Sequence, residues 1–195
     1  MVLDALCGPQ FEPIESLSLR MLSLKTLFLL AITTAKRVSD LQALSIHEHC
    51  FRMDPEGRRE LMQPDLSFVT KNQVVAPLPV ALLAYHPPPF SSPEDKRLHC
   101  LCPVRVLRQY VRRTALFRAS VKQLFVTHGL GKAAGKVAAT PTLYRWQSSW
   151  RIHPRGWTCR MVSRPIPPGQ WPLRGLLLRV SPSLRSVWLR TGLLC

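Results

Sequence analysis

The sequence predicts a mixed α/β domain, dominated by helices and carrying a small β-hairpin sheet, over about its first 146 residues. Three observations lead to this fold class. Apolar residues recur at helical spacing in two long segments, short apolar runs flank a Pro-Glu-Gly turn, and hydrophobic residues make up 46% of the chain. A chain of 195 residues with this composition is long enough to bury one hydrophobic core.

The first long helix is predicted over residues 14–35, because apolar residues recur there every three or four positions. Its buried stripe consists of Leu17, Met21, Leu24, Phe28 and Ala31. A second helix is expected to begin near Ser39, which forms a capping box with Gln42. Residues 33–38 are therefore predicted to be a tight joint between two helices.

Short strands are predicted over residues 50–53 and 66–70, with a turn at 55–57. Pro77 and Pro79 restrict the next stretch to an edge strand or a loop, and residues 87–89 are three prolines that stiffen a loop. A strand is also expected over residues 122–127, followed by a flexible basic loop over 129–136.

The second long helix is predicted over residues 103–117, since Pro103 suits its first position. The expected buried stripe is Val104, Leu107, Val111 and Ala115, and the expected basic face is Arg105, Arg108, Arg112 and Arg113. A last helix should begin at Thr140, with Pro141 in its first turn.

The formal net charge is +16 and the pI is about 10.7, which favours a polyanionic partner such as nucleic acid or an anionic membrane surface. The charge is unevenly distributed. Residues 147–195 hold eight arginines, four of the five tryptophans and no Lys, Asp or Glu. This segment shows no sustained helical or alternating pattern, so we expect an Arg/Trp/Pro-rich tail that does not pack on the first 146 residues.

Six scattered cysteines without a disulfide framework favour a reducing compartment. Asp4 and Glu12 replace the basic start of a secretory signal, so none is expected. The longest apolar run, residues 27–32, is far shorter than the ~20 residues of a membrane span. We therefore expect no membrane span.

Four segments in order resemble the catalytic domain of tyrosine recombinases, the DNA breaking-and-rejoining enzymes. In residues 34–44, Thr-Ala-Lys-Arg-Val-Ser-Asp-Leu-Gln-Ala-Leu, an arginine is followed by an aliphatic residue, a small residue, an acid and a leucine. Residues 84–90, 101–105 and 123–126 read Ala-Tyr-His-Pro-Pro-Pro-Phe, Leu-Cys-Pro-Val-Arg and Gln-Leu-Phe-Val. Together they are similar to recombinases of DIRS-like retrotransposons, over about residues 17–146.

The resemblance implies that Arg37 is a catalytic arginine, supported by Asp40, and that Lys71 matches the β-hairpin lysine that protonates the leaving oxygen. A guanidinium at a helix start suits the extra negative charge of a phosphodiester transition state. Alternatively, Arg37 and Asp40 form a plain surface ion pair and Lys71 is a solvated lysine. The resemblance further implies a nuclear protein that binds double-stranded DNA, associates with itself or with an intact recombinase copy, and needs no cofactor. The predicted DNA contacts are Lys36, Arg37, Lys71, Arg105, Arg108 and Arg112.

The family also needs a His-x-x-Arg segment, a later His or Trp, and a tyrosine nucleophile near the C-terminus. After Trp146 the chain has no His-x-x-Arg and no tyrosine. Codons chosen for residues 160–169 and read from their third base can encode Asp-Gly-Val-Lys-Ala-His-Ser-Thr-Arg. Codons for residues 187–192 can likewise encode Leu-Ala-Ala-Asp-Trp. We infer a frameshift at or shortly after Trp146, and a partial, catalytically inactive domain before it.

A zinc site is the remaining chemical candidate. The two segments that suggest it hold His47, His49 and Cys50, and His99, Cys100 and Cys102. They lack the two- to four-residue gaps of ordinary zinc fingers, so we expect no metal there. Two other functions remain open: a basic nucleic-acid-binding module without enzymatic ancestry, and a binder of anionic membrane surfaces through Trp157 and Trp171 in the tail.

Overall fold

A computed structural model describes residues 2–65, 79–118, 120–128, 134–148, 150–153 and 156–159 of the chain. The described elements follow the order α1 (Val2–Leu6), α2 (Leu19–Thr34), α3 (Val38–Gln42), β1 (Phe51–Met53), β2 (Arg59–Met62), β3 (Val80–Leu83), α4 (Pro93–Leu98), the 3-10 helix η1 (His99–Leu101), α5 (Pro103–Thr114), α6 (Thr140–Ser148), β4 (Trp150–His153) and β5 (Gly156–Cys159). The mixed α/β fold class is therefore confirmed, with helices predominant.

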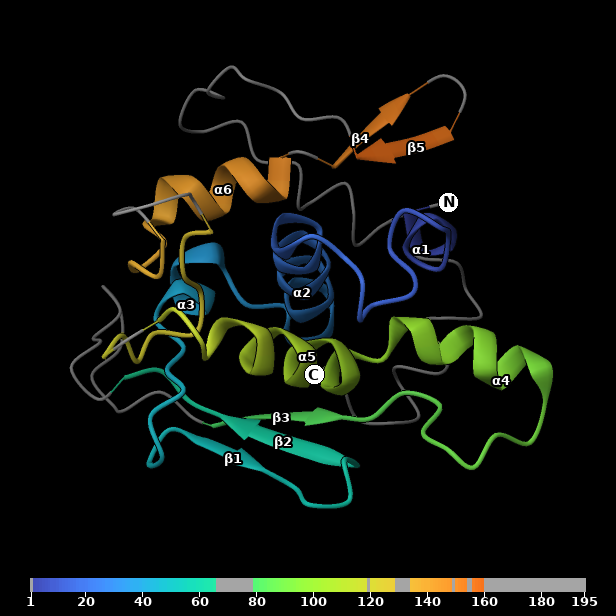
Figure 1. Ribbon diagram of the computed structural model, residues 1–195, viewed down its shortest axis with the longest axis horizontal. Coiled ribbons are helices and arrows are strands. Elements are labelled where there is room, and N and C mark those ends of the chain that lie inside the picture. The colour runs from blue at the N-terminus through green and yellow to red at the C-terminus, as the bar shows by residue number, and fades with distance from the viewer. Residues whose placement is uncertain are drawn as a thin grey trace.

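Helix α2 is the centre of the core, and it is apolar around most of its circumference. Its residues from Leu22 to Ala31 are all buried. In Figure 1, α5 runs between α2 and the three-stranded sheet, and α6 covers α2 from the other side. A helix that is hydrophobic all round is expected where neighbours cover it on several sides.

Helix α2 begins later than the predicted helix over 14–35. The hydroxyl of Ser18 accepts the backbone N–H of Met21 at 3.3 Å and caps the first turn. Residues 8–17 form turns instead, although Leu17 is buried as expected. The apolar pattern does not mark this boundary, because Ile14 and Leu17 lie in turns before the helix and are buried in the same core as the helix residues.

The three-stranded sheet is antiparallel in the order β1-β2-β3, with Phe51 opposite Met62 and Arg59 opposite Leu83. Strand β1 and the turn at 55–57 agree with the prediction. Strand β2 was not predicted, and the strand predicted over 66–70 lies outside the described residues. Strand β3 follows the proline-containing stretch and lies at the edge of the sheet, as the prolines indicated.

Helix α5 was predicted almost completely, but it ends at Thr114. Val104 and Leu107 are buried as expected, Val111 is partly buried, and Ala115 is exposed, contrary to the prediction, because it lies just beyond the helix. Residues 123–126 form isolated bridges to residues 45 and 137 in place of the predicted regular strand. Their side chains from Leu124 to Val126 are nevertheless buried in the core.

Helix α6 begins at Thr140, as predicted, and continues to Ser148, two residues into the tail. The start of the tail also carries strands that its composition did not indicate. Strands β4 and β5 then pair as an antiparallel hairpin, with Trp150 opposite Cys159. Figure 1 shows this hairpin beside α1. Everything after Cys159 lies outside the described residues, as does the predicted frameshifted His-x-x-Arg segment.

Among the described helices, none has both the length and the apolar character needed to cross a membrane.

Candidate nucleic-acid interface

Arg37 lies at the joint between α2 and α3, as the sequence predicted. Helix α2 ends at Thr34, and Ala35 adopts a left-handed backbone conformation with φ 52° that turns the chain toward α3. Arg37 is the N-cap residue of α3 and its side chain is exposed. A guanidinium at this place is open to solvent beside the positive end of a short helix.

Asp40 contacts the backbone of Arg37. Its Oδ2 atom accepts the backbone N–H of Arg37 at 3.3 Å, so the acid caps α3. Ser39, which was predicted to be the cap, lies inside the helix and its Oγ atom lies 3.4 Å from Asp40 Oδ1. In the part of the chain that the structure describes, the guanidinium of Arg37 forms no ion pair with Asp40. Asp40 therefore orients the main chain at the joint, because its carboxylate binds the backbone N–H of Arg37 and not the guanidinium.

Of the two predicted lysines, Lys36 lies within this joint and Lys71 lies much further along the chain. Lys36 is partly buried, and its backbone N–H donates to Thr34 Oγ1 at 3.3 Å. Lys71, the predicted hairpin lysine, lies outside the described residues. The proximity of Lys71 to Arg37 thus stays a prediction.

Two of the four arginines on the predicted basic face of α5 are paired with acids from elsewhere in the fold. Arg105 donates two hydrogen bonds of 2.9 Å each to the carboxylate of Glu12. Arg108 donates to Glu60, whose side chain is fully buried. Two parallel N–H bonds to one carboxylate form the strong, charge-assisted arrangement. Arg105 and Arg108 therefore bind inside the protein, which reduces the charge that they offer to a phosphate.

The last turn of α5 provides the other two arginines. Arg113 donates to the backbone carbonyl of Leu17, which ties α5 to the segment before α2. Arg112 is exposed and forms no ion pair with any residue that the structure describes. Of the four arginines predicted on this face, Arg112 is the one best placed to contact a phosphate.

A buried ion network connects the N-terminal segment to the core. The Nζ atom of Lys25, whose side chain is 0% exposed, lies 2.6 Å from Glu12 Oε1 and donates to the carbonyls of Leu6 and Phe11 at 2.9 and 3.2 Å. Glu12 thus binds Lys25 and Arg105 at once. The sequence does not reveal this pair, because a lysine inside an apolar helix stretch gives no signal of its partner.

The pKa values in this network follow from burial and charge. Burial alone would raise the pKa of Glu12, but the hydrogen bonds from Arg105 and Lys25 outweigh it and hold that pKa below its usual value. An acid with a lowered folded-state pKa stabilises the fold above its unfolded pKa, and this stabilisation is lost as the pH falls through the folded-state pKa.

We therefore expect the contribution of Glu12 to stability to disappear as the pH drops below about 4.3, the ordinary glutamate value. The measurement is the free energy of unfolding in urea from pH 7 to pH 3, compared between the parent chain and Glu12→Gln. The difference between the two chains should shrink over this range. A difference that stays constant with pH would show that Glu12 is not ionised in the folded protein.

The second buried carboxylate, Glu60, behaves in the opposite way. Burial raises its pKa in spite of the guanidinium of Arg108, and its Oε2 atom has no hydrogen-bond partner among the residues that the structure describes. A raised pKa in a buried acid means that the free-energy cost of removing its charge from water exceeds the stabilisation by the one arginine beside it. Glu60 and Arg108 therefore fix the packing of α5 on β2 more than they stabilise the chain.

A cavity of about 500 Å³ opens beside α5, between the turn at 56–58 and the loop at 87–88. Arg58, Arg105, Arg108 and Arg112 line it, together with His99 and the acids Glu15 and Glu56. Arg58 Nε lies 3.0 Å from Glu56 Oε2, so most of the cavity's positive charge is paired. Arg37 does not line this cavity, and the structure therefore does not unite the two predicted groups of cations in it.

The three tyrosines lie in the folded part of the chain. Tyr110 is fully buried, its hydroxyl oxygen accepts the backbone N–H of Val126 at 3.1 Å, and burial raises its pKa. Tyr85 and Tyr144 are partly buried and pack against the core. None of them occupies the C-terminal position that the resemblance requires of a nucleophile.

The two segments that suggested a zinc site, residues 47–50 and 99–102, share no metal-binding group among the described residues. Cys102 caps α5 and its Sγ atom accepts the backbone N–H of Arg105 at 3.5 Å and of Tyr85 at 3.3 Å. Cys50 is buried, with its Sγ atom 3.8 Å from the carbonyl of Pro64. Both thiols therefore serve local structure.

Comparisons with models of known protein families, with curated proteins and with solved structures find no match to this chain.

Proposed function

We propose that this chain is a DNA-binding remnant of a tyrosine recombinase that does not cut DNA. The observation that supports the proposal best is the position of Arg37, which is exposed at the joint between two helices. The carboxylate of Asp40 binds the backbone N–H of Arg37, and the guanidinium forms no ion pair in the described structure. The resemblance of residues 34–44 requires an arginine that faces a phosphate at this joint.

The charge of the chain supports the same proposal. Nineteen of the 27 Lys and Arg residues and all 11 acids lie before residue 147, so both the core and the tail carry excess positive charge. Binding through phosphates needs no base recognition and weakens steeply with salt, because each neutralised phosphate releases counterions. We therefore infer weak binding to duplex DNA without sequence preference, within the nucleus.

We expect the logarithm of the DNA-binding constant to fall linearly with the logarithm of salt, at about −0.9 per phosphate contacted. Fluorescence anisotropy with a labelled duplex at 50–200 mM salt would measure the slope. Arg37→Gln and Arg112→Gln should each make this slope less steep by about 0.9, the contribution of one phosphate contact. Arg97→Gln is the matched control, since Arg97 already donates two hydrogen bonds to Glu94.

Two results would contradict the proposal. A flat salt dependence would remove phosphate binding altogether. Equal losses in Arg37→Gln and Arg97→Gln would show that binding depends on total charge, and the recombinase-like site at Arg37 would then have no support.

A further inference from the structure

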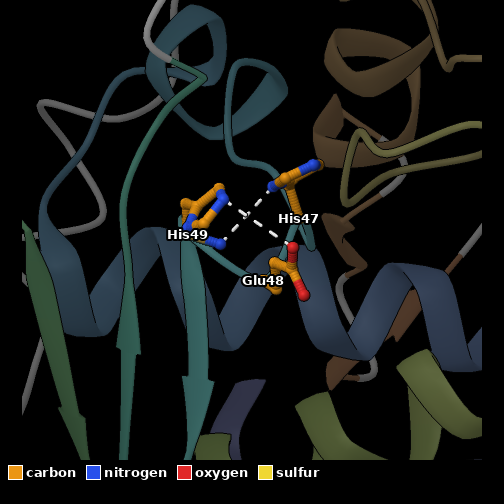
Figure 2. A group of neighbouring side chains, drawn as sticks. All are labelled: His47, Glu48 and His49. Atoms are coloured by element: carbon orange, nitrogen blue, oxygen red, sulfur yellow. Dashed lines mark hydrogen bonds and ion pairs between the residues drawn. The ribbon is translucent and has the colours of Figure 1, made fainter.

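Three side chains that can ligate a metal extend from one turn, between residue 46 and β1. They belong to consecutive residues, His47, Glu48 and His49, and one ligand atom of each lies within 4.8 Å of the others. Figure 2 shows the two imidazole rings and the carboxylate converging on a common centre. His49 Nε2 lies 3.7 Å from Glu48 Oε1, and His47 Nδ1 accepts the backbone N–H of His49 at 3.4 Å, a hydrogen bond that an ion bound at this nitrogen would replace.

The backbone of this turn is held on both sides. The carbonyl of His47 accepts the N–H groups of Cys50 at 2.7 Å and Phe51 at 2.9 Å, and the side chain of Gln63 donates to the carbonyl of His49 at 2.8 Å. On the other side, the backbone N–H of Ile46 donates to the carbonyl of Lys122 at 2.7 Å. Only side-chain torsions remain to be ordered when an ion binds, which lowers the entropic cost of binding.

We propose that His47, Glu48 and His49 bind a divalent transition-metal ion of the zinc, nickel and copper class. Imidazole nitrogens suit these ions, and one carboxylate completes a set of three ligands whose charge offsets part of the ion's. In a tetrahedral site with bonds of about 2.0 Å, ligand atoms lie about 3.3 Å apart. The present separations are larger, 3.7 Å between His49 Nε2 and Glu48 Oε1 and up to 4.8 Å within the set, and must close by rotation of His49 and Glu48, whose side chains are 74% and 81% exposed.

The site is distinct from the zinc site that the cysteines suggested. Cys50 follows the three ligands directly, but its buried thiol lies against the carbonyl of Pro64 and does not join them. Glu48 takes the place of that thiol, which gives a ligand set of nitrogen and oxygen only. Water fills the remaining coordination positions, because all three side chains lie at the surface. This inference is independent of the proposed DNA binding.

Cobalt(II) is the probe that separates this site from a cysteine site. We expect the full chain to bind one equivalent of cobalt and to show ligand-field absorption without a thiolate-to-cobalt charge-transfer band. His49→Ala and Glu48→Gln should each weaken binding by about tenfold or more, because losing only an outer-shell partner of a metal ligand already costs about tenfold. His86→Ala is the matched control, since His86 pairs with Asp95 at 2.8 Å but has no third ligand beside it in the described part of the chain.

Circular dichroism of each variant confirms that the fold is unchanged, which the exposure of His49 and Glu48 leads us to expect. A strong thiolate charge-transfer band would overturn the proposal in favour of a cysteine site. Equal weakening in His49→Ala and His86→Ala would overturn it in favour of nonspecific binding. Retained cobalt affinity in both His49→Ala and Glu48→Gln would show that the turn is not the site.

Discussion

We expect Glu12→Gln to lower the free energy of unfolding by about 3–5 kcal/mol, the cost of leaving a buried charge without its partner. Lys25 is inaccessible to solvent and Arg105 is only 24% exposed, and both bind the carboxylate of Glu12. Glutamine has the same shape but no charge, so two cations would then lie side by side. A loss of this size is a large fraction of the about 5–15 kcal/mol that stabilises a typical domain.

Urea denaturation at pH 7 measures this effect, and Glu15→Gln is the matched control. Glu15 also lies near Arg105, at 3.8 Å, but its side chain is 62% exposed. An exposed pair contributes at most about 1 kcal/mol, so Glu15→Gln should change the stability little. If the two variants lost equally little stability, Lys25 would have to be neutral in the folded chain, or Glu12 would not be its partner.

The helices of this fold were predictable where a local signal marks them. Helix α5 begins at a proline after a residue that caps it, and its apolar residues recur with helical period. Helix α4 was missed although Ser92 and Pro93 begin it with the same signals, because none of its residues is buried and it therefore has no apolar stripe. Periodicity finds a helix only where one of its faces packs on the core.

Strand β2 could not be predicted because its pattern depends on a distant partner. Glu60 is fully buried in this strand, and an acid at a buried position contradicts the apolar alternation that identifies strands. Its partner, Arg108, lies 48 residues further along the chain. The same reason explains why Arg105 was predicted to face DNA: the sequence places it on a basic helix face, and only the fold brings Glu12 to it.

The joint at Arg37 was predictable because both of its components are local. The helix before it, the helix after it and the acid three residues on all lie within one short segment, and the structure places them as expected. The role of Asp40 was only partly foreseen. An acid three residues after an N-cap accepts the backbone N–H more readily than it reaches a long, solvated guanidinium. The part of the site contributed by Lys71 depends on residues outside the described structure.

We expect the full chain to form no covalent adduct with DNA that contains a recombination site or a nick. Strand exchange requires a tyrosine that attacks the scissile phosphate. Tyr110 is buried with its hydroxyl bound to the backbone of Val126 and its pKa raised by burial, so it cannot reach a phosphate. Tyr85 and Tyr144 pack against the core, and neither matches the family's motif. After Trp146 the chain also lacks His-x-x-Arg, and groups that act as a unit lose most of their rate when one is absent.

A suicide substrate with a nick beside the scissile phosphate tests this on a denaturing gel, where a covalent protein–DNA species would migrate slowly. An intact tyrosine recombinase on its own site is the positive control. An adduct that Tyr144→Phe abolishes would reveal a nucleophile in the described fold and would refute the proposal of an inactive remnant.

The inferred frameshift has a separate test: the genomic nucleotides after the codon of Trp146, read in the alternative frame, should encode His-x-x-Arg followed by a tyrosine. If that frame contains no tyrosine, the tail is not a frameshifted recombinase, even if the adduct experiment shows no cleavage.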